Sequence, residues 1–338
     1  MIRALIAAFA VLALTACAPL VQKVGRPDQT FAGPRFEQDA FVTFDGTRLG
    51  LQHWDAPGEP WAVIVGLHGM NDYSNAFHLA APVWAADGIT SYAFDQRGYG
   101  RSPRRGVWGG REAMTEDLRT AVALARQRYP HAVIAVAGIS IGGAISIDAF
   151  ASDRPPAADR LVLLSPAVWG WSHQPVTNVV ALWAVAHTFR GAVIKPPRFL
   201  LKKIHASDNV DELIRMGNDP LMLWGARPDA IYGAMNAMQR ASKETADLKV
   251  PTLYAYGNRD DIIPKSAAFP AAAKLPPPAR TAYYPGGHHL LLIDLERARV
   301  IGDVEAFLRN PQAPAPSGVG PISKVVPKRH GAVVPGAG

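Results

Sequence analysis

Cysteine is almost absent from this sequence, and charge of either sign is spread thinly over its body. Cys17 is the only cysteine among 338 residues, so no disulfide can form within the chain and stability depends on an apolar core. Hydrophobic residues make up 49% and charged residues 19%, enough for a large core. The formal net charge is +7, but five basic residues near the two ends leave +2 for residues 4–308. This balance excludes a body built to bind nucleic acid.

Signatures of metal and phosphate binding are also missing. The ten histidines include no pair spaced as in His-Glu-x-x-His, and no glycine-rich phosphate loop is present. We therefore expect no metal and no cofactor. The sequence leaves the oligomeric state open.

The N-terminal residues have the layout of a bacterial secretory signal. Arg3 gives a basic start, and the apolar run over residues 4–14 is too short to span a bilayer. The segment Leu14-Thr15-Ala16-Cys17 then resembles the lipobox of bacterial lipoproteins. That resemblance implies a signal peptide over residues 1–16 and a diacylated Cys17 that holds the protein on a membrane. Because Ala18 rather than Asp follows, it also implies the outer membrane of the cell envelope. The alternative is an ordinary cleaved signal with a chance cysteine.

Short apolar runs alternate with helical patterns along the body of the chain. A hairpin with an Asp45-Gly46 turn comes first, since Asp-Gly suits a turn that needs positive φ. Residues 112–128 repeat apolar side chains at three- and four-residue spacing, as a helix lying on a sheet does. The expected parallel strands are residues 62–65, 90–94, 133–136, 161–164, 252–256 and 281–284. This alternation predicts a doubly wound, mostly parallel sheet.

The domain organisation follows from where this alternation of strands and helices stops. Residues 17–34 read as a tether, and residues 35–166 and 250–308 as two parts of one core. Residues 167–249 hold no convincing strand but contain an apolar helix and four tryptophans, which predicts a helical cap over the core. The alternative is a second helical layer without a role in substrate binding. Residues 309–338 are rich in Pro, Gly, Ala and Val without a period, which predicts a disordered tail.

The strongest chemical signal is Gly138-Ile139-Ser140-Ile141-Gly142. It follows an apolar strand and opens a helix, so Ser140 is expected on a strained strand-to-helix turn that its glycine neighbours allow to close. The helix N-terminus beneath it favours developing negative charge. We therefore predict Ser140 as a nucleophile. The alternative is a glycine-rich turn that only lets backbone segments approach.

A serine nucleophile needs a base and an orienting acid, and each follows a late strand. Asp260 and Asp261 come after the strand that ends near residue 256, and His288 and His289 come after the next one. Spacing does not choose within either pair. The oxyanion donors are expected to be the N–H of Ile141 and the N–H of Met70, in the loop after residues 62–65. His68, at the end of that strand, is expected to have a structural hydrogen-bonding role instead of serving as the base.

Five motifs in order make a family resemblance specific. They are His68-Gly69-Met70, Asp95 to Ser102, Gly138 to Gly142, Gly257-x-x-Asp260-x-Ile-Ile-Pro264 and Gly287-His288-His289. Together they resemble the monoacylglycerol lipase and lysophospholipase group of the serine aminopeptidase-like α/β-hydrolases, over roughly residues 40 to 308. The resemblance implies the α/β-hydrolase fold, with Asp260 as the acid and His289 as the base. The chain departs from many relatives at Asn71, Asp72 and Tyr73, where they carry Gly, an acidic residue and His.

The sequence thus predicts a serine hydrolase that cleaves carboxylic esters. The apolar cap and the membrane anchor favour a monoacylglycerol or a lysophospholipid as substrate. One alternative is an aminopeptidase or amidase of the same fold, in which Asp208, Asp211 or Glu212 of the cap would receive a substrate amine. Another is a non-catalytic envelope lipoprotein.

Overall fold

One mixed sheet organises the residues described by the computed structural model, which are residues 18–189, 191–195 and 204–322. The predicted signal peptide, Cys17 and residues 323–338 lie outside them. The strands are β1 (Arg35–Phe36), β2 (Ala40–Val42), β3 (Arg48–Trp54), β4 (Ala62–Leu67), β5 (Ile89–Phe94), β6 (Val133–Ile139), β7 (Arg160–Leu164), β8 (Thr252–Gly257) and β9 (Arg280–Tyr284). The helices are η1 (Ser74–Phe77), α2 (Ala81–Ala86), α3 (Arg111–Arg128), α4 (Ile141–Phe150), η2 (Trp171–His173), α5 (Val176–Thr188), α7 (Val210–Gly217), α8 (Pro228–Glu244), η3 (Thr245–Asp247), α9 (Lys265–Ala273) and α10 (Arg297–Arg309).

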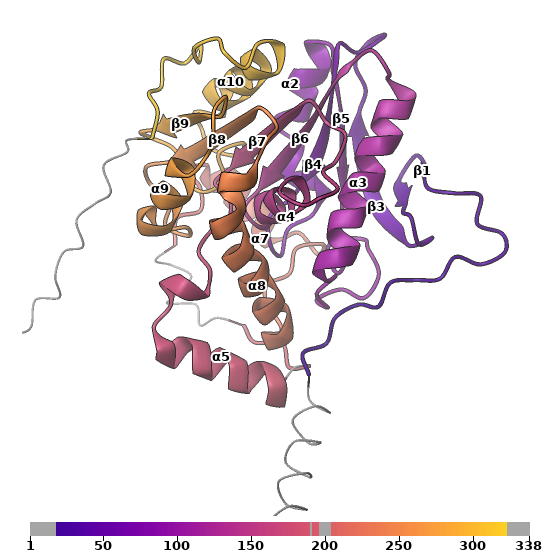
Figure 1. The fold of residues 1–338 in the computed structure, drawn as a ribbon, viewed down its shortest axis with the longest axis vertical. Helices are drawn as coiled ribbons and strands as arrows, with labels where there is room; N and C mark the ends of the chain where they lie inside the picture. Colours follow the sequence, from indigo (N-terminus) through magenta and orange to yellow (C-terminus); the bar gives the residue numbers. More distant parts are fainter. Residues whose placement is uncertain (1–17, 190, 196–203, 323–338) are drawn as a thin grey trace, which may run out of the picture.

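The strand order is β1-β2-β3-β5-β4-β6-β7-β8-β9 (Figure 1). Strands β1, β2 and β3 pair antiparallel, and β3 also runs antiparallel to β5. From β5 to β9 every neighbouring pair is parallel. The predicted mostly parallel sheet is therefore confirmed. Because these strands run in one direction, their carboxyl ends meet at a single edge of the sheet.

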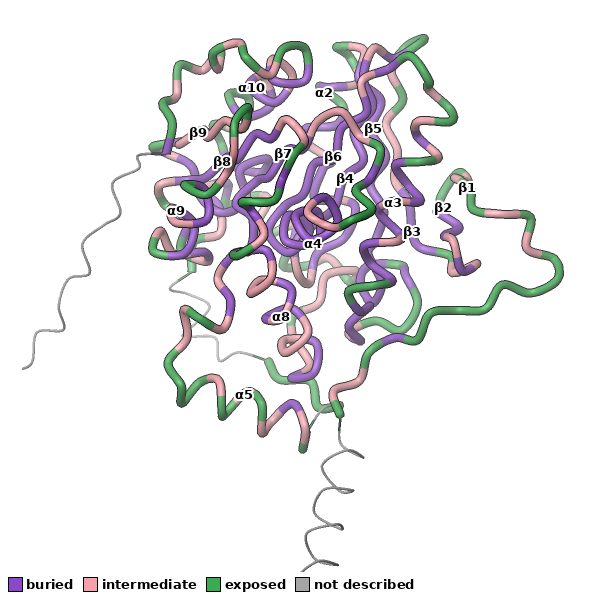
Figure 2. The backbone as a smooth tube through the Cα atoms, in the orientation of Figure 1, coloured by how far each residue is buried: buried purple, intermediate pink, exposed green. Residues whose placement is uncertain are grey.

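The parallel strands are apolar throughout because helices cover both faces of the sheet. In β4, Val63 and Val65 pack into a core shared with α3 and α4. The intervening Ala62 and Ile64 pack into a second core with α2 and α10. A strand buried on both faces has no polar side to alternate with. Figure 2 shows the central strands buried along their length, with most exposed residues in the outer helices, the loops and the antiparallel edge.

The first hairpin is closed by the predicted turn, and that turn is fastened to the core by a buried arginine. Gly46 has φ of 78° between β2 and β3, a conformation that glycine adopts without strain. Arg97, in the loop after β5, donates to Asp45 of the turn at 2.9 Å and to Asp117 of α3 at 2.6 Å. All three side chains are buried. This two-carboxylate clamp fixes the antiparallel end of the sheet to the helix layer.

The regular elements described within residues 167–249 are helical, as the sequence predicts. Helix α8 continues the core, since Ala234, Ala237 and Ala241 pack with residues of α4. Helix α5 lies outside α8, at the lower end of the molecule in Figure 1, and its His187 ring is 5.7 Å from the Tyr232 ring of α8. No helix among the described residues combines the length and apolarity needed to span a bilayer.

Part of the segment expected to be a tether is fixed to the core. Val21 forms a parallel β-bridge with Trp108, and Gln22 is buried, with its backbone N–H donating to Trp108 O at 2.9 Å. Gly25 N–H donates to the Asp45 carboxylate at 2.7 Å. The segment expected to be a tether is therefore held to the core from Val21 onward.

The tail begins later than we predicted from composition. Disorder from residue 309 onward is wrong for residues 310–322, because polar groups in this segment find partners on the core. Ser317 N–H donates to Asp303 of α10 at 2.9 Å, and Ile322 N–H donates to the Thr281 hydroxyl of β9 at 2.9 Å. The Ile322 side chain is buried. The proline-rich composition that suggested disorder here belongs to an extended strap.

Candidate active site

Ser140 occupies a strained turn between β6 and α4. Its φ is 51° and its ψ is −114°, a conformation that a residue with a side chain adopts only at a cost of about 1–3 kcal/mol. The flanking glycines make the turn possible. A Cβ on Gly138 would lie 2.7 Å from Gly142 O, and one on Gly142 would lie 2.4 Å from Leu67 O of β4. The predicted Gly-x-Ser-x-Gly turn therefore has the geometry that presents a serine side chain above the sheet.

Asp260 and His289 are brought together although they follow different strands. His289 Nδ1 lies 2.9 Å from Asp260 Oδ2, and both side chains are buried. The other carboxylate oxygen of Asp260 accepts from the backbone N–H groups of Ile262 at 2.8 Å and Ile263 at 2.9 Å. An acid held in this way keeps the proton of His289 on Nδ1, so that Nε2 can accept a proton.

The neighbours of these two residues point elsewhere. Asp261 is exposed and lies 3.3 Å from His205. His288 is buried, and its Nδ1 lies 3.6 Å from Asp294. Of the four combinations left open by spacing, the structure forms an Asp260–His289 pair, in line with the family resemblance.

Close backbone contacts fix the acid and histidine loops to one another and to the strand ends. A Cβ on Gly257 would lie 2.4 Å from the carbonyl oxygens of Gly287 and His288, so the loops can meet only because residue 257 is glycine. Arg259 N–H donates to Gly287 O at 2.8 Å. Ser140 N–H donates to Leu164 O of β7 at 3.1 Å, which ties the serine turn to the same edge of the sheet. Ser140, Asp260 and His289 thus all follow parallel strands at their carboxyl edge.

The loop expected to supply an oxyanion donor lies against the serine. A Cβ on Gly69 would be 3.5 Å from the Ser140 Cβ, so Met70 directly follows a residue in contact with the nucleophile turn. Ile141 is the first residue of α4, where backbone N–H groups have no partner inside the helix. Gly69 and Ile141 thus both lie next to Ser140, and the role of the Met70 and Ile141 N–H groups as oxyanion donors stays a prediction.

His68 supports this loop and is confirmed as a structural residue. Its ring is fully buried, Gln96 N–H donates to Nε2 at 2.9 Å, and Nδ1 lies 2.6 Å from Gly69 O. Nε2 is thus the acceptor, so Nδ1 carries the proton and donates to Gly69 O. Burial lowers the pKa of His68 to about 4, which keeps the ring neutral.

The turn from Asp95 to Ser102 braces the loop that carries His68 and Met70, since Gln96 is hydrogen-bonded to His68. The Asp95 carboxylate is buried and accepts from the backbone N–H groups of Ser74 at 2.9 Å and Arg101 at 2.8 Å. The Ser102 hydroxyl donates to Asp95 O at 2.5 Å. All of these bonds stay within the scaffold behind the serine.

Two carboxyl groups near the site, those of Asp72 and Asp294, were not predicted from the sequence. Asp72, two residues after Met70, is buried, lines a small cavity with Ile139 and Leu164, and accepts from Tyr73 N–H at 2.8 Å. Burial raises the pKa of Asp72 to about 7. The second group is Asp294, which accepts from the Ser207 hydroxyl at 2.7 Å and from His288 N–H at 2.7 Å. The acidic residue at position 72 was visible as a departure from relatives, but its burial was not.

The cap is hydrogen-bonded to both loops that border the serine. Leu290 N–H donates to Ala206 O at 2.9 Å, beside the histidine. Leu223 N–H donates to Asn71 O at 2.9 Å, beside the oxyanion loop. The Tyr73 hydroxyl, from the same loop, donates to Asp219 of the cap at 2.6 Å. A shift of the cap would therefore move the histidine loop and the loop after β4, which are expected to position the reacting atoms.

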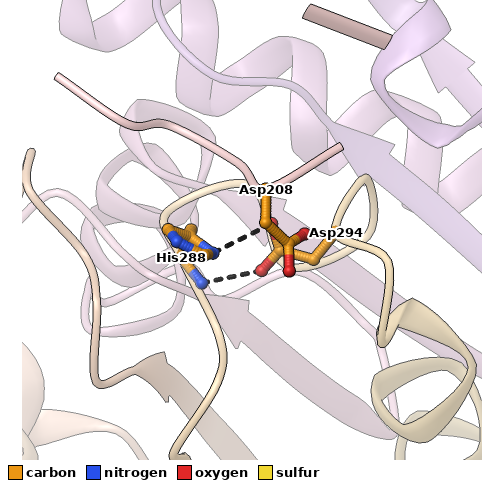
Figure 3. Close-up of side chains that lie close together, drawn as sticks. All are labelled: Asp208, His288 and Asp294. Carbon is orange, nitrogen blue, oxygen red and sulfur yellow. Dashed lines mark hydrogen bonds and ion pairs between the residues drawn. The ribbon is translucent and has the colours of Figure 1, made fainter. Parts of the chain in front are cut away.

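One group of side chains has the composition of a metal site, namely Asp208, His288 and Asp294 (Figure 3). Their ligand atoms lie within 4.8 Å of one another. Both oxygens of Asp294 are already engaged by Ser207 and His288 N–H, and Asp208 accepts from Leu295 N–H at 2.8 Å. These bonds assign the group to bracing the histidine loop beneath the cap.

The raised pKa of Asp72 gives a testable pH dependence. Unfolding lets this carboxyl ionise with its ordinary pKa of 3.8, whereas in the folded protein it stays protonated up to about pH 7. Its contribution therefore favours the folded state at low pH and is lost as the pH rises from about 4 to 7. Asp72→Asn, which mimics the protonated acid, should gain stability relative to wild type over this range, by on the order of 4 kcal/mol. Urea unfolding of both proteins from pH 4 to 8 measures the difference, and a difference that stays constant would contradict the assignment.

Comparisons with known proteins agree with this geometry. The family model described as serine aminopeptidase, S33, matches residues 58–296. The monoacylglycerol lipase of Mycolicibacterium smegmatis is 27% identical over 274 residues, which cover 80% of this chain and 96% of that protein. The monoglyceride lipase of Rattus norvegicus is 27% identical over 257 residues, covering 74% of this chain and 82% of that protein.

Solved structures share the architecture. A soluble variant of monoglyceride lipase from Saccharomyces cerevisiae, in complex with a substrate analog, has a TM-score of 0.68 at 19% identity and covers 88% of this chain and 100% of that chain. Monoacylglycerol lipase from Paleococcus ferrophilus has a TM-score of 0.62 at 23% identity and covers 77% of this chain and 95% of that chain. With the observed sheet, these likenesses confirm the predicted α/β-hydrolase fold.

Proposed function

This chain belongs to the serine aminopeptidase, S33, family, and from that premise we propose that it is a serine hydrolase of carboxylic esters. The observation that carries the proposal is the buried bond of 2.9 Å between His289 Nδ1 and Asp260, at the sheet edge where Ser140 sits on its strained turn. A histidine oriented by an acid, at the same sheet edge as a serine on a strained turn, gives the base and the nucleophile that acyl transfer requires.

The reaction proceeds through an acyl-enzyme on Ser140. Ser140 Oγ attacks the ester carbonyl carbon while His289 Nε2 takes the hydroxyl proton, and Asp260 stabilises the resulting imidazolium. The N–H groups of Met70 and Ile141 stabilise the negative oxygen of the tetrahedral intermediate. His289 then gives its proton to the departing alcohol. Water attacks the acyl-enzyme in the second half, with His289 again taking and returning a proton, and the free acid leaves.

The cap and the relatives support a proposal for the substrate class. The cap bears an apolar helix, α5, and two relatives named as monoacylglycerol or monoglyceride lipases align over most of this chain. We propose a long-chain monoacylglycerol or lysophospholipid in preference to a small soluble ester. Turnover measured on an ester series from acetyl to palmitoyl should rise with chain length. A maximum at acetyl or butyryl with collapse at long chains would contradict the lipid assignment.

An aminopeptidase or amidase needs an acidic group free to receive the substrate amine. Two of the three cap acids considered for that role are engaged within the protein. Glu212 lies 2.7 Å from Arg215 and 3.2 Å from His78, and Asp208 accepts from Leu295 N–H. This pairing favours the ester hydrolase, and an aminoacyl anilide assayed beside the esters separates the two activities.

We also propose that the protein is anchored in the bacterial envelope by acyl chains on Cys17, in the outer membrane since Ala18 follows. Support comes from the Leu14-Thr15-Ala16-Cys17 segment and its charged and apolar leader. Incorporation of an alkynyl fatty acid during growth should be lost in Cys17→Ser. Equal labelling of the wild type and of Cys17→Ser would contradict the proposed anchor.

A further inference from the structure

Helix α7 is held at its N-terminal end by the segment that follows the two histidines. Its N-cap residue is Asn209, whose side-chain amide donates to Ile293 O at 3.0 Å. Just before it in the chain, the Ser207 hydroxyl donates to Asp294 at 2.7 Å. Ser207 and Asn209 are both buried. Because a buried polar group is costly to leave unpaired, these bonds fix the start of α7 to the histidine loop.

The other end of α7 is held by the loop after β4. Asp219, two residues beyond the end of the helix, accepts from the Tyr73 hydroxyl at 2.6 Å. A little further on, Leu223 N–H donates to Asn71 O at 2.9 Å. A helix of eight residues such as α7 is about 12 Å long. One short rigid element therefore joins the histidine loop to the loop that is expected to supply an oxyanion donor.

Residues 69–72 form the turn in which that donor is expected. Asp72 N–H donates to Gly69 O at 3.4 Å, and Asn71, the third residue of the turn, has φ of 65°. Several turn types require a positive φ at this place, and Asn adopts it more readily than most residues. Met70 is the second residue of the turn, and its N–H has no acceptor among the residues that the structure describes. This N–H is therefore available to a substrate oxygen.

The two sides of this turn are fixed by different parts of the molecule. On the first side, His68 Nδ1 donates to Gly69 O at 2.6 Å, which holds the planar peptide group that also contains Met70 N–H. On the second side, the attachments are those to the cap, through Asn71 O and through Tyr73. A turn held on one side only can pivot about that side. The direction of Met70 N–H therefore depends on the attachments to the cap as well as on His68.

Tyr73 is well suited to make such an attachment. Its side chain is buried, and burial, together with the acceptor Asp219, raises the pKa of the hydroxyl, so that it remains a donor at neutral pH. The second oxygen of Asp219 accepts from Leu221 N–H at 2.8 Å, which fixes the acceptor as well. A phenol hydroxyl stands further from the backbone than either nitrogen of an imidazole. The bond to Asp219 thus depends on the tyrosine that this chain has where many relatives have histidine.

We propose that Tyr73 is a positioning residue of the hydrolase, which through Asp219 ties the turn at residues 69–72 to α7 and keeps Met70 N–H directed at the oxyanion. The inference deepens the proposed function and rests on it. Tyr73 itself contacts none of the reacting atoms. Because α7 is bonded to the histidine loop at its other end, the same helix sets the position of the base relative to that of the oxyanion donor.

Tyr73→Phe tests the proposal in the full chain, because it removes the hydroxyl and keeps the ring. On a soluble butyryl ester, kcat should fall about tenfold with little change in KM, since a misdirected donor weakens the transition state and not the bound ester. The inhibition constant of a trifluoromethyl ketone should rise by a similar factor. Ser140 Oγ adds to the ketone carbon, its proton passes to His289, and the ketone oxygen becomes an oxyanion. Affinity for this inhibitor therefore reports the oxyanion site without any leaving group.

Tyr284→Phe is the matched control. The Tyr284 hydroxyl also donates to a buried carboxylate, that of Asp303, at 2.8 Å, but this bond joins β9 to α10. Its loss should lower the midpoint of urea unfolding and leave kcat and the inhibition constant unchanged. A merely structural role of Tyr73 predicts that same result for Tyr73→Phe. Unchanged kcat and inhibition constant in Tyr73→Phe would therefore overturn the proposal.

Asp219 provides a second test of the same bond. Asp219→Ala removes the acceptor of both Tyr73 and Leu221 N–H, so its loss of kcat should be at least as large as that of Tyr73→Phe. In a chain that already carries Asp219→Ala, Tyr73→Phe should cost nothing further, because two groups that act through one bond are not additive. Losses that multiply in the double variant would contradict action through Asp219.

Wild-type activity separates failure of this proposal from failure of the proposed function. Hydrolysis of the ester by the wild type, with both constants of Tyr73→Phe equal to those of the wild type, would reject the positioning role and leave the hydrolase assignment in place. Absence of both hydrolysis and inhibitor binding in the wild type would contradict the hydrolase assignment, and with it any part played by Tyr73 in the reaction.

Discussion

Ser140→Ala is expected to reduce kcat/KM on a carboxylic ester by about 10⁴-fold or more, because removal of the nucleophile of a triad leaves only binding and oxyanion stabilisation. The substitution removes one oxygen, and alanine is accommodated at the turn about as well as serine is. The loss should therefore appear in the chemical step, with little change in the unfolding midpoint. A fluorophosphonate probe should label wild type and fail to label the variant.

Ser165 offers a matched control for this result. Like Ser140 it follows a parallel strand at the carboxyl edge, it is buried, and its φ is positive at 43°. Its backbone N–H donates to Ala255 O at 2.9 Å, and Ser165→Ala leaves this bond in place. Ser165→Ala should keep both labelling and turnover. Absence of labelling in wild type would remove the enzyme assignment altogether.

His289→Ala and His288→Ala are expected to differ by several orders of magnitude in kcat, although the two residues are adjacent and both are buried. His289 is bonded to Asp260 and presents Nε2 as the base, whereas His288 faces Asp294. His288→Ala keeps the bond from its backbone N–H to Asp294, so the loop should hold its shape. Steady-state rates on one ester, with the unfolding midpoint of each variant, distinguish a catalytic role of each histidine from a structural one.

Comparable losses of kcat in the two variants, without loss of folding, would overturn the choice of His289. A loss in His288→Ala that follows its unfolding midpoint would instead report the loop brace formed by Asp208, His288 and Asp294. Rescue of His289→Ala by added imidazole would support the base directly, since a small molecule then occupies the vacated place.

The parts of the site that sequence reasoning predicted are those encoded by local pattern. Ser140 was found because the turn needs glycines on both sides, and structure gives the reason in the contacts of Gly138 and Gly142. The acid and histidine pairs were found because each follows an apolar strand. Choosing Asp260 and His289 needed the family resemblance, since adjacent identical residues carry no spacing signal. The alternating runs likewise predicted the sheet, because strands buried on both faces must be apolar throughout.

What could not be predicted depends on contacts between segments far apart in the chain. The Ser207 hydroxyl meets Asp294 across 87 positions, and nothing near either residue marks the pair. An aspartate is ordinarily ionised and exposed, so the sequence gives no sign that Asp72 is buried. Its burial results from packing against η1 and the strand ends. Residues 310–322 have the composition of a disordered segment, yet bonds to Asp303 and Thr281 order them. Composition reports average tendency, whereas these outcomes rest on single partners.

The strap over residues 310–322 also covers backbone groups at the β9 edge of the sheet. Strand β9 is the last in the order, and its outer backbone groups would otherwise be available to another chain. Tyr283 N–H donates to Gly320 O at 2.9 Å, so the strap occupies part of this edge, while the opposite edge is the two-residue strand β1. A sheet with one edge partly covered and the other only two residues long leaves few backbone groups open to strand-to-strand aggregation.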